Sequence, residues 1–206
     1  MCCHAKPTYE TVLPCLALVL LLALGHARAA PPRAEVGSFE WRGRAIVVFR
    51  IEDVVSDAPD RDTFAIELAE RLNAYTGREG VEACARICRA LDRAGWGASL
   101  ITIHSHAACP RTRVCPSGTE PTDIDIHSHL HVERYRPSAL DRLFLSRSYG
   151  ARDLVGTIPG RFSPHDFQGG AGYMVNEQTL LFQDGEHNVR LVSRMPRAPS
   201  AHERTN

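Results

Sequence analysis

Lysine is almost absent from this sequence: Lys6 is the single lysine among 206 residues. Chemistry that needs an amine side chain, such as Schiff-base formation or a Ser-Lys dyad, is therefore excluded from the rest of the chain. Beyond residue 29 there are 22 arginines against 23 aspartates and glutamates, which leaves this part close to neutral. Such a balance gives no support for nucleic acid or an anionic membrane surface as a partner. An enzyme built from it has to use His, Asp, Glu, Ser, Cys or a metal.

The chain also lacks an apolar run long enough to cross a membrane. The apolar stretch from Val12 to Gly25 is shorter than the roughly 20 residues that a spanning helix needs. It is followed by Ala27-Arg28-Ala29, the small-x-small pattern of signal peptidase sites. We therefore predict a signal peptide over residues 1–29, cleavage close to Ala30, and a periplasmic or secreted protein with no lipid anchor and no stable membrane association. The alternative is an uncleaved N-terminal anchor.

Four cysteines remain beyond the predicted cleavage site: Cys84, Cys88, Cys109 and Cys115. In an oxidising compartment an even number favours two disulfides, with three possible connectivities. A zinc site of four thiolates is the alternative, although the spacings of three and five intervening residues fit the usual zinc knuckles poorly. If residues 82–91 form a strand, Cys84 and Cys88 lie about 13 Å apart, at ~3.3 Å per residue. Each of them must then pair with Cys109 or Cys115.

Hydrophobic patterning predicts an α/β fold, with a mixed, mostly antiparallel sheet and flanking helices. We expect a flexible lead at 30–38, a single domain at 39–194 and a disordered tail at 195–206. Runs rich in β-branched residues and stripes at helical spacing predict the elements. Strands are expected at 39–55, 98–105, 123–132, 172–175, 179–183 and 188–192, and helices at 63–75 and 138–149. Residues 82–91 are ambiguous, because composition favours a helix and alternation favours a strand.

Two pairs of histidines have a spacing that suits a metal site. His127 and His129 lie two apart on a predicted strand and therefore project from the same face, as neighbouring zinc ligands must. His104 and His106 have the same spacing, so the pattern alone does not choose between the pairs. The structural alternative is that each pair belongs to a polar strand face exposed to water.

The segment Phe162-Ser-Pro-His-Asp166 predicts the start of a helix. Ser163 can cap it, Pro164 suits the first helical position, and Asp166 falls where a carboxylate favours the helix dipole. This structural account is complete by itself. A carboxylate held at a helix start is also well placed to be a third ligand beside two histidines, which leaves a fourth zinc position for water.

Three segments in order resemble the JAB/MPN (JAMM-type) zinc metalloprotease signature, which is a Glu, a later His-(Ser/Thr)-His-Pro and a later Ser-x-x-Asp. They are Glu82-Ala-Cys-Ala-Arg-Ile-Cys88, His127-Ser-His129 and Ser163-Pro-His-Asp166. The stretch from Phe162 to Val192 is similar to the C-terminal end of JAB-like domains in bacterial secreted proteins. The resemblance covers roughly residues 63–192. It implies a JAB/MPN-like, cytidine-deaminase-like architecture in which Glu82 begins a strand.

The resemblance also implies residue roles. His127, His129 and Asp166 would bind Zn²⁺. Glu82 would be the general base, with Glu79 as the fallback, and Ser163 would hydrogen-bond the developing oxyanion or the water.

The family order places strands between the Glu and the histidines, which favours the second His-Ser-His over the first. Substitution of His104 or His106 is therefore expected to change neither metal content nor activity. The expected function is zinc-dependent hydrolysis of peptide or isopeptide bonds in a peptide or protein substrate, outside the cytoplasm.

The sequence departs from the family pattern at three places. Leu130 stands where the family has Pro, Ala85 stands where Gly is common, and an insert with a predicted helix separates His129 from Ser163. The insert could form a lid over the site. These departures motivate the alternative hypothesis, a non-catalytic JAB-like binding or interaction module.

Overall fold

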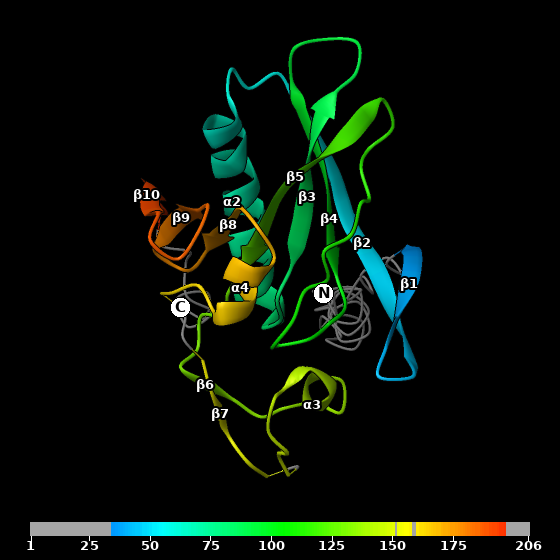
Figure 1. The fold of residues 1–206 in the computed structure, drawn as a ribbon, viewed down its shortest axis with the longest axis vertical. Helices are drawn as coiled ribbons and strands as arrows, with labels where there is room; N and C mark the ends of the chain where they lie inside the picture. Colours follow the sequence, from blue (N-terminus) through cyan, green and yellow to red (C-terminus); the bar gives the residue numbers. More distant parts are fainter. Residues whose placement is uncertain (1–33, 151, 158–159, 197–206) are drawn as a thin grey trace, which may run out of the picture. The chain divides into compact units, whose positions relative to one another are not determined.

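The computed structural model describes residues 34–150, 152–157 and 160–196 (Figure 1). The predicted signal peptide and its cleavage site lie outside the described residues. Among the helices that the structure describes, none combines the length and the apolar composition needed to cross a bilayer.

An eight-stranded sheet organises the fold, in the order β1-β2-β4-β3-β5-β8-β9-β10 (Figure 1). All neighbouring strands pair antiparallel except β5 and β8, which run parallel. The predicted α/β fold, a mixed and mostly antiparallel sheet with flanking helices, is confirmed. The strands of this sheet are β1 (Glu35–Trp41), β2 (Arg44–Ser56), β3 (Cys84–Ala90), β4 (Trp96–Thr102), β5 (Thr119–Ser128), β8 (Gly172–Val175), β9 (Thr179–Gln183) and β10 (Val189–Arg194). A separate pair is formed by β6 (Arg134–Tyr135) and β7 (Val155–Gly156).

One face of the sheet packs against the long helix α2 (Arg61–Glu79). Asp60 caps the start of α2 by accepting from the Thr63 N–H, and Gly80 ends it with a left-handed backbone at φ 70°. The apolar stripe of the helix meets alternate residues of the strands and forms the main core. Its fully buried members include Phe64, Leu68, Leu72, Ala83, Ile87, Leu100, Ile126 and Tyr173.

The opposite face of the sheet carries a second, smaller core. Ile46, Val48, Cys84, Ile101 and Ile103 are its buried members. The residues packed against them come from three other segments: β1, the loop at 108–109, and the one-turn helix α3 (Asp141–Phe144) with its flanks. Because side chains alternate along a strand, β3 sends Ala85 and Ile87 toward α2, as does Ala83 just before it, and sends Cys84 toward this second face.

The predicted strand at 39–55 is instead the hairpin of β1 and β2. Arg42 and Gly43 have φ values of 49° and 74°, the backbone of a tight two-residue turn that matches strand twist. The apolar content on both sides concealed this turn. β1 begins at Glu35, so residues 35–38 of the expected lead are part of the sheet. At the other end, Met195 is buried in the main core rather than part of a tail.

The predicted helix at 138–149 is reduced to the single turn α3, and Leu145 is already extended. One cause is a competing donor: the Trp41 Nε1–H donates to the Leu143 carbonyl at 3.0 Å. In a longer helix that carbonyl would accept from residue 147. Trp41 also stacks on Phe144 at 5.5 Å between ring centroids, so tertiary packing replaces helical propagation here.

Residues 84–90 form β3, which settles the ambiguous segment as a strand. Cys84 bonds to Cys109 and Cys88 bonds to Cys115, with Cα–Cα distances of 5.9 and 6.1 Å. The prediction that each strand cysteine pairs with one of the loop cysteines is confirmed, and the four-thiolate zinc site is contradicted. Two disulfides are typical of chains that fold in an oxidising compartment.

Candidate metal centre

Antiparallel pairing of β3 with β5 places the candidate side chains on one face of the sheet. Cys84 lies opposite His127, and mutual hydrogen bonds join Ser128 to Ala83 one step further. By the same register Glu82 lies beside His129. Since alternate residues share a face, Glu82, His127 and His129 all project to the side opposite α2.

Ser128, between the two histidines, projects toward the other face and is fully buried. Its hydroxyl lies 2.6 Å from the Thr76 hydroxyl of α2 and contacts both the N–H and the carbonyl of Ala83. This side chain therefore joins α2, β3 and β5 at the level of the site. It limits how far the flanking histidines can shift along the strand.

Asp166 reaches the site from the short helix α4 (Pro164–Gln168). Ser163 caps this helix: its hydroxyl accepts from the Asp166 N–H at 3.4 Å, and its own N–H donates to Asp166 Oδ2 at 2.6 Å. This reciprocal arrangement is a capping box with Asp in the place of Glu. The predicted helix start is confirmed, and the cap holds the Asp166 carboxylate in a defined orientation.

Two further side chains hold Asp166 from behind. The Arg111 Nη2–H donates to the Asp166 carbonyl at 3.1 Å, and the buried Gln183 Nε2–H donates to the same carbonyl at 3.2 Å and to that of Gly170 at 2.6 Å. Arg111 and Gln183 were not among the residues predicted from the sequence. For Gln183 the sequence held one indication: it is a polar residue at the end of an otherwise apolar strand, Thr-Leu-Leu-Phe-Gln183.

The three predicted ligands converge. His127 Nε2 lies 3.2 Å from His129 Nε2 and 3.4 Å from Asp166 Oδ1, and His129 Nε2 lies 3.9 Å from Asp166 Oδ2. One ligand atom from each residue fits within 4.8 Å of the others. In a tetrahedral zinc site with bonds of about 2.0–2.1 Å, ligand atoms are separated by ~3.3–3.4 Å. Two imidazoles and one carboxylate at this separation fit a divalent metal with an open fourth position.

Burial sets the charge states of these groups. It acts with the charge of His129 to lower the pKa of His127 to about 4, which keeps this imidazole neutral, as a metal ligand must be. Burial alone would raise the pKa of Asp166. The charge that His127 carries once it is protonated at low pH, together with the hydrogen bonds from Ser163, outweighs burial and holds that pKa below its ordinary value. The site therefore presents one neutral imidazole beside a carboxylate in its anionic form.

Glu82 lies at the start of the segment that leads into β3. Its N–H donates to the Ser105 carbonyl at 2.9 Å, and its carbonyl accepts from the Thr102 hydroxyl at 2.8 Å, which ties this segment to the end of β4. Burial raises the pKa of the Glu82 carboxyl well above its ordinary value, and the charges of Asp166 and Asp141 add to the effect. A carboxylate with a raised pKa is a stronger base than an ordinary one, which suits it to take a proton from a neighbouring group.

A cavity of about 710 Å³ connects these residues. Glu82, His127, His129, Ser163 and Asp166 all line it. Much of the remaining wall is apolar and includes Phe39, Trp41, Leu130, Phe144, Val155 and Phe162. The insert between His129 and Ser163 therefore forms part of the cavity wall. Leu130, which stands in place of the family Pro, is buried in a small core with Tyr135 and Val155 of this insert.

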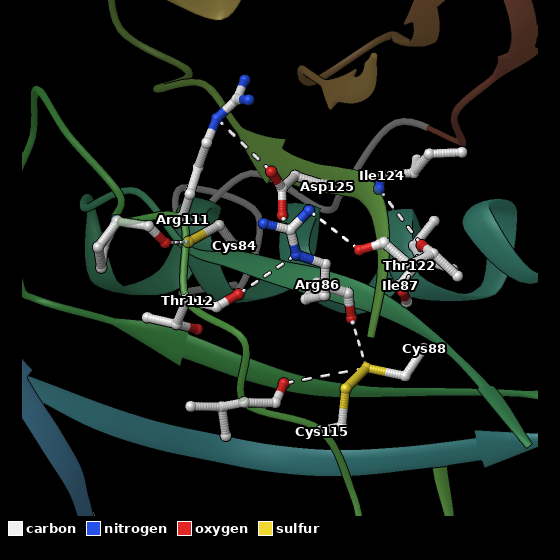
Figure 2. Close-up of polar contacts among 12 residues, drawn as sticks. Cys84, Arg86, Ile87, Cys88, Arg111, Thr112, Cys115, Thr122, Ile124 and Asp125 are labelled. Carbon is white, nitrogen blue, oxygen red and sulfur yellow. Dashed lines mark hydrogen bonds and ion pairs between the residues drawn. A yellow bond between two sulfur atoms is a disulfide. The ribbon is translucent and has the colours of Figure 1, made fainter. Parts of the chain in front are cut away.

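Residues 109–112 form another side of the cavity, and the bridges Cys84–Cys109 and Cys88–Cys115 hold their loop against β3; Figure 2 shows the second bridge. The buried Asp125 carboxylate is 3.0 Å from Arg86 Nε and 3.5 Å from Arg111 Nε (Figure 2). The Arg86 Nη1–H also donates to the Thr122 carbonyl at 3.1 Å. This network places Arg111 between Asp125 and the Asp166 carbonyl.

Two other candidates, Glu79 and His104, lie outside the described lining of the cavity. Glu79, the fallback for the base, is in the last turn of α2 and forms an ion pair with Arg78. His104 has φ 59° and packs against the Phe49 ring at 5.2 Å between centroids. Neither residue belongs to the described lining of the cavity, whereas His106 does.

Comparison of the chain with protein-family models, with curated proteins and with solved structures finds no match.

Proposed function

We propose that this chain is a zinc-dependent hydrolase of peptide or isopeptide bonds, similar in its site to the JAB/MPN metalloproteases. The observation that carries the proposal is the convergence of His127, His129 and Asp166 at zinc-ligand separations in a cavity that Glu82 also lines. Bound there, zinc would polarise a carbonyl group and lower the pKa of a coordinated water to about 7.

The chain's own groups divide the remaining work. Glu82 would take a proton from the attacking water and return it to the leaving amine, and its raised pKa supports both transfers. Ser163 lines the cavity, but its hydroxyl already accepts from the Asp166 N–H. These contacts support a role of Ser163 in orienting Asp166. The hydrogen bond to the developing oxyanion or the water is the role that the family resemblance implies for the same hydroxyl.

The proposed place of action is the periplasm or the extracellular space. The support is the pair of disulfides, since thiols are kept reduced in the cytosol, together with the signal-peptide pattern over residues 1–29. The expected substrates are therefore exported proteins or peptides, or cell-wall peptides.

The test combines elemental analysis with hydrolysis of a peptide library. Chain produced from residue 30 onward with its disulfides formed is expected to bind one zinc per molecule and to cleave a subset of peptides. His127→Ala and Asp166→Asn should both lose the zinc and the activity, because three protein groups are the minimum in open catalytic zinc sites. Glu82→Gln should keep the zinc and lose about 10²–10⁴-fold in kcat, since a general base is not a ligand.

The matched control for the metal ligands is His104→Asn. Asn is among the residues that adopt positive φ readily, so this variant should preserve the backbone, the zinc and the activity. A chain that binds zinc at the three ligands but cleaves no peptide would favour the non-catalytic binding module. Full activity in Glu82→Gln would remove the proposed general base.

A further inference from the structure

A further histidine of the cavity, His106, has a buried carboxylate beside it. His106 Nδ1 lies 2.8 Å from Asp141 Oδ2, and His106 lines the same cavity as Glu82 and the three metal-ligand candidates. Asp141 belongs to α3 and its side chain is fully buried. The pair therefore joins the end of β4 to the insert.

The Asp141 carboxylate accepts three hydrogen bonds besides its contact with the His106 ring. The Ser105 hydroxyl and the His106 N–H donate to Oδ1 at 2.7 Å each, and the Ser138 N–H donates to Oδ2 at 2.7 Å beside the His106 ring. A carboxylate with this many donors is held as the anion, which can only accept. The ring contact therefore requires a hydrogen on His106 Nδ1, and Nε2 is the ring nitrogen left to bind a ligand.

The surroundings of the ring direct Nε2 toward the cavity. Nδ1 faces the fully buried carboxylate, and one ring face stacks on Tyr135 at 5.0 Å between centroids and 12° between planes. The His106 side chain is nevertheless 28% exposed. Since its Nδ1 edge and one face are covered, its exposed part includes the Nε2 edge on the cavity side.

We propose that His106 is a substrate-contacting residue, whose Nε2 accepts a hydrogen bond from an N–H group of a bound peptide, with Asp141 as the positioning residue behind it. That the ligand is a peptide rests on the proposed function. The place of the His106 ring beside Asp141 and in the cavity wall rests on the geometry alone. From the sequence, His106 was expected to have no part in the site, because the first His-Ser-His was only a rival metal-binding pair.

The same helix turn supplies the neighbouring wall of the cavity. Asp141 begins α3 and Phe144 ends it, and the Phe144 ring stacks on Trp41. Phe39, Trp41 and Phe144 all line the cavity together with His106. The peptide class that fits is therefore one with a large apolar side chain next to the N–H group that His106 accepts.

Two substitutions separate the two ring nitrogens. His106→Asn keeps an amide N–H where Nδ1 was, so the contact with Asp141 is kept. It removes Nε2, the proposed acceptor on the cavity side. His106→Gln extends a carbonyl toward the former position of Nε2 and so restores an acceptor. His104→Asn is the matched control, since His104 does not belong to the described cavity lining.

Binding is measured without turnover, in the zinc-loaded Glu82→Gln chain, with N-acetyl-alanyl-phenylalanine amide as the probe. Nuclear magnetic resonance titration gives the dissociation constant and the probe-induced shift of the His106 ring nitrogens. His106→Asn should weaken binding by about 2- to 12-fold, the range for the loss of one neutral hydrogen bond. His106→Gln should recover part of that loss, and His104→Asn should match the parent. Zinc content and the urea midpoint of unfolding should stay unchanged in all of them.

The kinetic arm uses the best library peptide in the chain with Glu82 intact, where His106→Asn should raise KM by a similar factor. Equal probe affinity in the Asn, Gln and parent chains would overturn the proposal, as would a probe that leaves the His106 nitrogens unshifted. Loss of zinc from His106→Asn would instead make His106 a metal ligand and also overturn it. If the wild-type chain cleaves no peptide but the binding pattern holds, the proposed function fails and the role of His106 stands.

Discussion

Removal of one disulfide at a time should separate the stability of the domain from zinc binding at the candidate metal centre. The two bridges close loops of nearly equal length, with sequence separations of 25 and 27 residues. Loop-closure entropy of the unfolded chain then predicts a stabilisation of about 3.5 kcal/mol for each. That is a large part of the 5–15 kcal/mol that domains of ordinary stability possess.

The two bridges differ in what they hold. Cys84 and Cys109 line the cavity, and Cys109 lies two residues before Arg111, whose guanidinium donates to the Asp166 carbonyl. Cys88 and Cys115 are outside the described lining. Removing the first bridge should therefore release Arg111 and weaken zinc binding by about 10- to 100-fold, the usual effect of losing a group that orients a ligand. Removing the second should leave zinc affinity within about threefold of wild type.

The assay compares the double variants Cys84→Ala/Cys109→Ala and Cys88→Ala/Cys115→Ala. Urea unfolding gives the free energy of each, and competition with a chelating dye gives the zinc affinity. The expected result is a similar loss of stability in both and a loss of zinc affinity in the first alone. Equal zinc affinities would refute the link from the Cys84–Cys109 bridge through Arg111 to Asp166. Stabilities that differ by more than about 2 kcal/mol would refute the loop-entropy estimate.

Three further predictions concern the carboxyl group, the support of α4 and processing. In the metal-free chain Glu82→Gln should raise the free energy of unfolding at pH 7 but not at pH 4. Burial raises the folded-state pKa of Glu82, so the stability of the wild type falls as the pH rises above the unfolded-state pKa. Urea titrations that show no difference between the two pH values would contradict this. Gln183→Ala should weaken zinc binding by about 10- to 100-fold, since it removes the amide that holds the Asp166 carbonyl, and dye competition measures it. Intact-mass measurement of exported protein should place the N-terminus near Ala30, and a product that retains residues 1–25 would contradict the predicted cleavage.

Local patterns were sufficient for the elements that carry the metal ligands. Strict alternation placed His127 and His129 on one face, although β5 ends at Ser128, one residue before His129 and short of the predicted end at 132. The cap pattern around Ser163 marked the start of α4. The strand geometry of 84–88 predicted that each strand cysteine pairs with a loop cysteine, but it left open which of Cys109 and Cys115 each one takes. In each case the deciding interaction lies within a few residues of sequence or follows from a single distance.

The parts that were missed depend on contacts between distant segments. Trp41 binds the Leu143 carbonyl across 102 positions and ends α3, so periodicity at 138–149 overestimated the helix. Asp141 meets His106 across 35 positions. A second Ser-x-x-Asp, at Ser138 to Asp141, was the available indication, because it makes the same reciprocal hydrogen bonds as Ser163 and Asp166. Without the fold, nothing in the sequence indicated that the motif at Ser138 to Asp141 contacts the His-Ser-His at 104–106.

The parallel pairing of β5 with β8 divides the candidate site between the sheet and the long connection that joins these two strands. Parallel neighbours cannot be joined by a tight turn, so the chain between Ser128 and Gly172 must cross over from one end of the sheet to the other. The sheet contributes Glu82, His127 and His129, while the crossover contributes Asp166 and much of the cavity wall. Lengthening a connection costs little, about 0.6 kcal/mol per doubling. Exchange of residues 131–162 for segments of other lengths would therefore alter the cavity wall, while the part of the sheet that positions Glu82, His127 and His129 stays the same.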